Sequence, residues 1–155
     1  MRRTDREVTD FSRMLEILQT CDCCRLGLVD KDEAYIVPMN FGIAQENGEL
    51  ILYFHAAKEG RKIDLLQKQS AVTFQADTGH RLLTAEQAGN FSYCYQCVMG
   101  KGIARLLTDP EDKIRGFRAI MSHYTQKTDW SFDLPCLDRV YVIALTVTDW
   151  SCKVH

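Results

Sequence analysis

The sequence lacks the features that identify a membrane, secreted or nucleic-acid-binding protein directly. No apolar run approaches the ~20 residues that cross a bilayer, and the charged start MRRTDREVTDF lacks the apolar core of a signal peptide. It also lacks a basic excess, because the formal net charge is −2 and the pI is about 6.1, which argues against a dedicated nucleic-acid binder. We therefore expect a cytoplasmic protein whose partners include neither membrane nor nucleic acid.

Prolines are few, and internal repeats, low-complexity tracts and linkers are absent from the sequence. A chain of 155 residues has the length of one domain. A domain of this size buries about 70% of the surface that its unfolded chain exposes. We expect residues 1–155 to form a single domain whose own core suffices for stability.

Cysteine, in contrast, is abundant, with seven copies. Without a secretion signal we expect reduced thiols and no disulfide framework. Cys94 and Cys97 have the spacing of metal ligands, and Cys21 with Cys23 could supply the other pair of a zinc site. However, residues 93–99 alternate as in a strand, which places residues three apart on opposite faces. We therefore expect buried free thiols and predict no metal site, with a zinc or redox site as the alternative.

The centre of the chain reads as a β-hairpin. Residues 34–45, AYIVPMNFGIAQ, alternate as in a strand, and Pro38 marks an edge or a bulge because it cannot donate a ladder hydrogen bond. Asn47-Gly48 follows, the strongest short-range hairpin signal. The returning strand, 49–55, is apolar on both faces. Such a strand suits the wall of a barrel that is packed against a helix or a second subunit.

Four further segments have strand-like patterns: 25–29, 71–76, 92–107 and 139–147. Gly100 and Gly102 predict a bend or bulge in the third of them, and residues 77–90 show no clear pattern. The six strands follow in hairpin-like order and lack the alternating βαβ pattern of a parallel sheet. We predict a mainly β fold, an antiparallel six-stranded barrel with peripheral helices.

Three helices are expected in the gaps between these strands. The first follows an N-cap at Thr9, the second covers 61–68, and the third starts at Asp109-Pro110, where an N-cap precedes a proline at the first helical position. The buried stripe of the third helix is predicted to consist of Ile114, Phe117, Met121 and Tyr124.

The stretch Tyr53–Leu66, YFHAAKEGRKIDLL, joins an apolar strand to the start of a helix. Gly60, Arg61 and Lys62 lie at that start, where unpaired backbone N–H groups and a partial positive charge favour an anion. Two cations at the positive end of a helix are unfavourable by roughly 0.3–1 kcal/mol each, so their presence predicts a bound phosphate. A ligand with a flat apolar body and a phosphate tail would match the strand and the helix start together.

This stretch resembles the split-barrel flavin-binding family that includes pyridoxamine 5'-phosphate oxidase, and within it the nitroimidazole-resistance (Nim) branch. That branch shares the pattern YFH-x-A-x-x-G-x-K-x-D-x-L, which this chain carries at Tyr53, Phe54, His55, Ala57, Gly60, Lys62, Asp64 and Leu66. The preceding YIVPMNF, the Asn-Gly hairpin, the later GKGIARLLTDPEDK and the terminal V-x-x-L-x-V strand fit the family in order. The resemblance covers nearly the whole chain.

The resemblance implies a homodimeric split barrel with FMN bound in grooves at the dimer interface. The flavin ring and ribityl chain would lie along the strand at 37–40, the helix start would take the phosphate, and another strand would reach the ring. The cofactor-binding residues so implied are Val37, Pro38, Met39, Asn40, Phe54, His55, Gly60, Arg61, Lys62 and Gln96.

His55 is implied as the catalytic residue. In the Nim branch a histidine at this position lies beside the reactive region of the flavin and is implicated in nitro-group reduction. An imidazole there could hydrogen-bond the flavin or the substrate, or donate a proton.

Two functions follow from the resemblance. The first is an FMN-dependent oxidoreductase that takes electrons from a small-molecule donor and reduces a small acceptor, such as a nitroaromatic compound. The alternative is a non-enzymatic carrier or sensor that binds flavin or haem on the same barrel.

Overall fold

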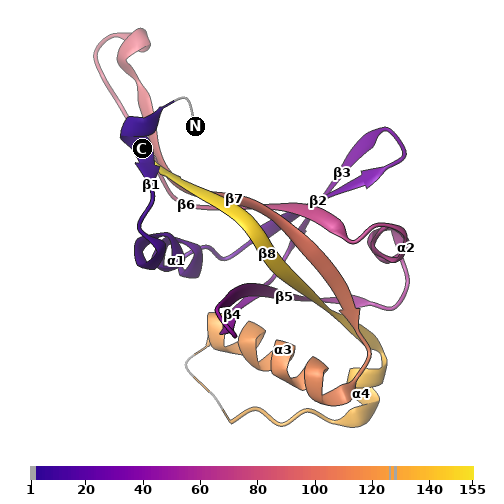
Figure 1. Cartoon of the computed structure of the whole chain (residues 1–155). Helices are drawn as coiled ribbons and strands as arrows, with labels where there is room; N and C mark the ends of the chain where they lie inside the picture. The colour runs from indigo at the N-terminus through magenta and orange to yellow at the C-terminus, as the bar shows by residue number, and fades with distance from the viewer. Residues whose placement is uncertain (1–2, 126, 128) are drawn as a thin grey trace.

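The computed structural model describes residues 3–125, 127 and 129–155 (Figure 1). Its strands form one antiparallel sheet in the order β3-β2-β6-β7-β8-β5-β4, and the short β1 pairs with β8. The strands are β1 Glu7–Val8, β2 Cys24–Asp30, β3 Glu33–Met39, β4 Gly42–Glu46, β5 Glu49–Ala57, β6 Ala71–Leu83, β7 Ser92–Leu107 and β8 Val140–Val154. The helices are α1 Phe11–Gln19, α2 Arg61–Lys68, α3 Pro110–Tyr124 and α4 Leu134–Asp138, with 3-10 turns at Thr4–Arg6 and Ala88–Asn90.

The prediction of a mainly β, antiparallel fold with peripheral helices is confirmed, but the prediction of six strands is wrong. The described residues form eight strands, and the sheet does not close, because β3 and β4 lie at opposite ends of the strand order. The difference arises chiefly at 34–45, where one predicted strand is divided at Asn40 and Phe41. Its first part, β3, pairs with β2, and its second part, β4, pairs with β5.

The division occurs where the chain turns into the core. Phe41 is fully buried, and its ring stacks on that of Phe54 with 6.4 Å between centroids. At Gly42 an added Cβ would lie 2.2 Å from the backbone nitrogen of Ile120 in α3. Alternating hydrophobicity continues through this point, so the period of the sequence alone does not reveal that the strand changes its partner.

Strand β5 is buried on both faces, as its sequence predicts. Its inner residues, Leu50, Leu52 and Phe54, belong to the main core. Its outer residues, Ile51 and Tyr53, form a second cluster with α3 and β8. The cover on the outer face is therefore α3, which lies across β4 and β5 in Figure 1.

The predicted buried stripe of α3 is wrong by about one residue. The buried positions are Lys113, Gly116 and Ile120, whereas Tyr124 is 39% exposed. A Cβ on Gly116 would lie 2.5 Å from a methyl carbon of Val142, so the glycine allows the helix to approach the sheet closely. Glycine carries no hydrophobic signal. The spacing of apolar residues therefore predicts that the stripe next to Gly116 is buried, and not the stripe that contains it.

Most local signals are confirmed. Asp109 caps α3 by accepting from the N–H groups of Glu111 and Asp112, and the register of β7 with β8 shifts at Lys101/Gly102, within the predicted bend. The cap of α1 is Asp10, which accepts from the N–H of Arg13, and not Thr9.

Strands β6 and β7 continue well beyond the rest of the sheet as a two-stranded arm (Figure 1). Residues 77–83, which show no clear pattern in the sequence, extend β6 into this arm. The arm exposes Leu82, Phe91 and Tyr93.

Among the described residues, no helix is both long and apolar enough to cross a membrane.

Candidate functional site

The start of α2 is fixed by a glycine and by burial of the opposite helix face. Gly60 adopts a φ of 123°, a conformation that L side chains rarely adopt, although an added Cβ would meet no atom within 4 Å. Its carbonyl accepts from the N–H groups of Ile63 and Asp64. Ile63, which is 1% exposed, anchors the first turn in the core. This arrangement holds Arg61 and Lys62 at the electropositive end of the helix, as predicted.

Arg61 is held in place on two sides. Its Nε donates to Oδ2 of Asp30 at 2.7 Å, and its guanidinium carbon lies 4.6 Å from the centroid of the Tyr35 ring. Both partners come from the β2–β3 hairpin, so this hairpin and α2 meet at the guanidinium. The carboxylate of Asp30 neutralises one of the two cations, which weakens the inference that the cations alone require a bound anion. The terminal Nη atoms make no hydrogen bond or ion pair with the described part of the chain.

His55 lies at the end of β5, close to Lys62. His55 is exposed, and the centroid of its ring lies 5.7 Å from that of Phe117 in α3. Partial burial, and then the positive charge of Lys62, lower the pKa of His55 below its ordinary value. The imidazole is therefore neutral at pH 7 and offers one N–H donor and one acceptor nitrogen.

Two strand edges near this position have no strand partner within the described residues. Strand β3 pairs with β2 alone, and the pairing of β4 with β5 ends at Tyr53, which leaves one edge of β5 free from Phe54 to Ala57. Unpaired N–H and C=O groups on such edges can bond to a ligand. The backbone at 37–40 and at His55 is thus available for polar contacts.

The side chains along these edges differ in their direction. Val37 packs against the core, Met39 is 8% exposed and Phe54 is fully buried, so these three would offer a ligand mainly their backbone. Pro38 and Asn40 are exposed.

Gln96 lies far from Arg61 within one chain. It is paired with Thr78 of β6, whereas the pairing of β2 with β6 ends at Gly27 and Thr73, three residues before Asp30. Thr73 and Thr78 are five residues apart on β6, roughly 16 Å at about 3.3 Å per residue, and Asp30 lies beyond the part of β2 that pairs with β6. The other predicted residues lie in or directly after β3, in β5, and at the start of α2, whereas Gln96 lies in β7.

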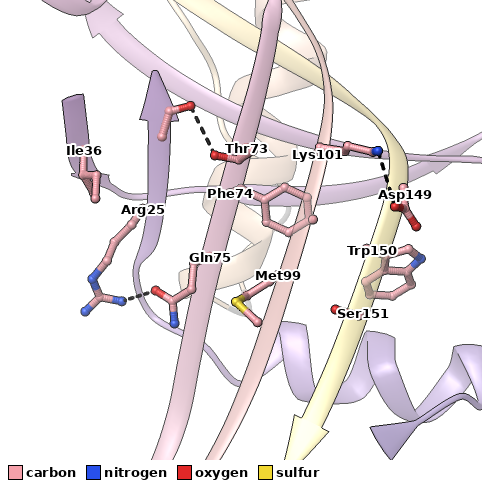
Figure 2. A pocket seen from close by; sticks show the side chains of 12 residues that line it. Arg25, Ile36, Thr73, Phe74, Gln75, Met99, Lys101, Asp149, Trp150 and Ser151 are labelled. Atoms are coloured by element: carbon pink, nitrogen blue, oxygen red, sulfur yellow. Dashed lines mark hydrogen bonds and ion pairs between the residues drawn. The ribbon is translucent and has the colours of Figure 1, made fainter. Parts of the chain in front are cut away.

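A groove that the sequence pattern does not predict lies on the outer face of the sheet (Figure 2). Its volume is about 550 Å³, and it crosses β2, β3, β6, β7 and β8. Ile36 and Met99 line it and are 63% and 47% exposed. The only signal for it in the sequence is that β3 and β7 carry apolar residues on both faces, which a single core does not require.

A polar network borders this groove. Gln75 accepts from Arg25 and donates to Oδ1 of Asp77 at 2.8 Å, and His80 contacts Oδ2 of Asp77 at 2.6 Å. Partial burial would raise the pKa of Asp77, but the hydrogen bond from Gln75 and the charges of Arg25 and His80 outweigh it and lower the pKa. The Asp77 carboxylate is therefore firmly ionised at neutral pH.

The cysteines are all free. Cys21, Cys24 and Cys152 are buried, as expected for small apolar residues, and burial raises the pKa of Cys21 to about 12. Cys94 and Cys97 are half-buried on β7. The described residues contain no group of three or more His, Cys, Asp or Glu side chains arranged to hold a metal ion.

The comparisons with known proteins identify the family of the chain. The family model described as pyridoxamine 5'-phosphate oxidase matches residues 10–154, and the chain belongs to this family. No curated protein matches the chain.

Solved structures reproduce the fold over almost the whole chain. A putative 5-nitroimidazole antibiotic resistance protein from Bacteroides thetaiotaomicron is 31% identical, with a TM-score of 0.82 over 96% of this chain and 86% of that one. The flavocytochrome Anf3 from Azotobacter vinelandii is 21% identical, with a TM-score of 0.81 over 100% and 72% of the two chains. An FAD- and haem-binding protein from Mycobacterium smegmatis is 16% identical, with a TM-score of 0.76 over 96% and 73%. The resemblance to the family and to its Nim branch is confirmed.

Proposed function

We propose that the protein is an FMN-dependent oxidoreductase that reduces a small acceptor, such as a nitroaromatic compound. The observation that carries the proposal is the start of α2. There a half-exposed Arg61 guanidinium is held with its terminal nitrogens free of partners among the described residues, and the neighbouring Lys62 lies close to a neutral His55 at the end of β5. These groups match the phosphate and the reactive region of a flavin mononucleotide.

The residues present fit this cofactor. Arg61 and Lys62 would bind the phosphate, together with the backbone N–H groups of the first turn of α2. The backbone at 37–40 would bond to the flavin edge and ribityl chain. When bound, the flavin supplies the electron transfer, while the protein supplies binding, orientation and electrostatics. His55, neutral at pH 7, would hold a proton on one ring nitrogen beside the acceptor.

The proposed active form is a homodimer with a flavin at each end of the interface. Gln96 lies on β7 opposite Thr78 of β6, away from the hairpin end that contacts Arg61, and in this proposal it would reach the ring bound by the partner. The groove on the outer sheet face, with exposed Ile36 and Met99, supplies an apolar surface for the second copy.

A non-enzymatic flavin or haem carrier or sensor is the second candidate. It is favoured by the structural likeness to a flavocytochrome and to an FAD- and haem-binding protein, which shows that this fold accepts both groups. A carrier or sensor would differ from the proposed oxidoreductase in one respect: it would bind the cofactor without catalysing electron transfer to an acceptor.

The test is extraction of the bound cofactor from the purified protein, followed by its mass and visible spectrum. We expect FMN and its absorption, and turnover with a reduced nicotinamide nucleotide and a nitroaromatic acceptor. Bound flavin without turnover would favour the carrier, a haem spectrum would favour haem binding, and failure to bind any flavin after reconstitution would contradict both flavin proposals.

A further inference from the structure

We propose that the β2–β3 turn selects FMN over FAD. Asp30 orients Arg61 for one phosphate group, and the carboxylates of Asp32 and Glu33 repel a second phosphate. This inference rests on the proposed function, because it concerns the flavin site described above.

The orientation of Arg61 follows from its two contacts. Asp30 accepts from Nε, and the ring of Tyr35 covers one face of the guanidinium. The Nη1–Nη2 edge is left for a ligand, and this edge matches two oxygens of one phosphate in bidentate geometry. Asp30 is thus a positioning residue, since it acts on the ligand through Arg61.

Arg61 also lines a hollow that is bordered by acidic side chains. A hollow of about 270 Å³ is lined by Arg61 and by the four turn residues, Asp30, Lys31, Asp32 and Glu33. Three carboxylates therefore face two cations, and Asp30 is already engaged with Arg61. Asp32 and Glu33 are exposed and form no ion pair with the described residues.

FMN and FAD would place different groups beside this hollow. FMN ends in a single phosphate monoester, which the guanidinium edge and the start of α2 can neutralise. In FAD the same phosphate continues into a second phosphate and an adenosine, which would extend past Arg61. A second anionic group beside Asp32 and Glu33 is repelled, and the repulsion acts at short range at physiological salt.

The general fold does not impose this selection, since a relative with the same fold is described as binding FAD. The selection must then come from local residues, and the turn at 30–33 is the charged element that borders the end of the site.

The test is titration of the flavin-free 155-residue chain with FMN and with FAD, followed by fluorescence. We expect FMN to bind at least about tenfold more tightly, a difference of roughly 1.4 kcal/mol. The variant Asp32→Asn/Glu33→Gln should lower the FAD-to-FMN ratio of Kd values about threefold or more. High salt should lower the same ratio in the wild-type protein, because it screens the repulsion. A matched control is Glu7→Gln/Glu49→Gln, which removes the same charge from exposed strand ends elsewhere and should leave the ratio unchanged.

The role of Asp30 is read from a double-mutant cycle. Asp30→Asn should weaken FMN about threefold in the wild-type background and have little effect in Arg61→Ala, because the aspartate acts through the arginine. Three results would overturn this inference alone. They are equal affinity for the two flavins, a ratio of Kd values that Asp32→Asn/Glu33→Gln leaves unchanged, and an equal effect of Asp30→Asn in both backgrounds. Failure of both flavins to bind overturns the proposed function as well.

Discussion

The hydroxyl oxygen of Tyr124 lies 3.1 Å from the backbone nitrogen of Phe41 and accepts its hydrogen bond. The same hydroxyl donates to the carbonyl of Asp22 at 2.8 Å. One side chain from the end of α3 thus holds the point at which the chain leaves β3 for β4, together with the residues that precede β2.

Tyr124→Phe tests this connection. The N–H of Phe41 and the carbonyl of Asp22 would lose their partner. The first hydrogen bond is part-buried and the second exposed, so the expected cost is about 0.5–1.5 kcal/mol. Thermal unfolding should show a fall of roughly 2–4 °C for each kcal/mol lost. Tyr93→Phe, in the exposed arm, is the control, and an equal effect of the two substitutions would contradict the role of the hydroxyl.

Gly42→Ala should destabilise the protein strongly. Its Cβ would lie 2.2–2.5 Å from backbone atoms of Ala119 and Ile120, so α3 would have to shift away from β4. Overpacking of this kind costs about 1–3 kcal/mol or more, measurable by urea unfolding. Gly89→Ala, where an added Cβ meets no atom within 4 Å, should change stability far less.

Asp77→Asn should lower stability at neutral pH and have less effect in acid. The pKa of Asp77 is lowered in the folded state, so its stabilising contribution is complete above the unfolded pKa, about 3.9, and is lost as the pH falls through the folded pKa. The difference in unfolding free energy between wild type and variant should therefore shrink below about pH 4. A difference that stays constant between pH 7 and pH 3 would show that the ionised carboxylate is not its source.

Arg61→Ala should weaken FMN binding by about tenfold or more, or roughly 1.4 kcal/mol, because the phosphate loses a charge-assisted bidentate partner. Flavin titration measures the change. Lys68→Ala, in the last turn of the same helix, removes an equal charge and should leave the affinity nearly unchanged. An unaltered Kd for Arg61→Ala would remove this residue from the phosphate site.

His55→Ala should retain flavin but reduce the acceptor more slowly in single-turnover measurements, because the proton held beside the acceptor is lost. An unchanged rate would refute the catalytic role of His55.

The pKa of His55 offers a separate check on its surroundings. Lys62→Gln should move this pKa upward, towards its ordinary value, because the Lys62 charge contributes to the lowering. NMR titration of the imidazole reports the shift, and Lys68→Gln is the control.

The elements that the sequence predicts well are those whose signals are local. Helix α2 and strand β7 have the predicted bounds, because Gly60 and the apolar spacing after it define the first and because the second alternates over a long stretch. The turn at Asn47-Gly48 has both residues at positive φ, as this pair favours.

The differences from prediction depend on tertiary contacts. The change of partner at Phe41 is fixed by α3, more than 70 residues away in sequence, and the face of α3 is set by Gly116 against Val142. The contact of Asp30 with Arg61 joins residues 31 apart. No periodicity in either segment indicates that contact, and it changes the charge balance on which the phosphate prediction depends.

Pro38 has a consequence for solubility as well as for the site. It lies in the strand that ends the sheet, where a continuous row of donors and acceptors would offer a template for strands of other molecules. A proline interrupts that row because it has no N–H. The same edge can therefore stay open to a small ligand while resisting fibrillar self-assembly.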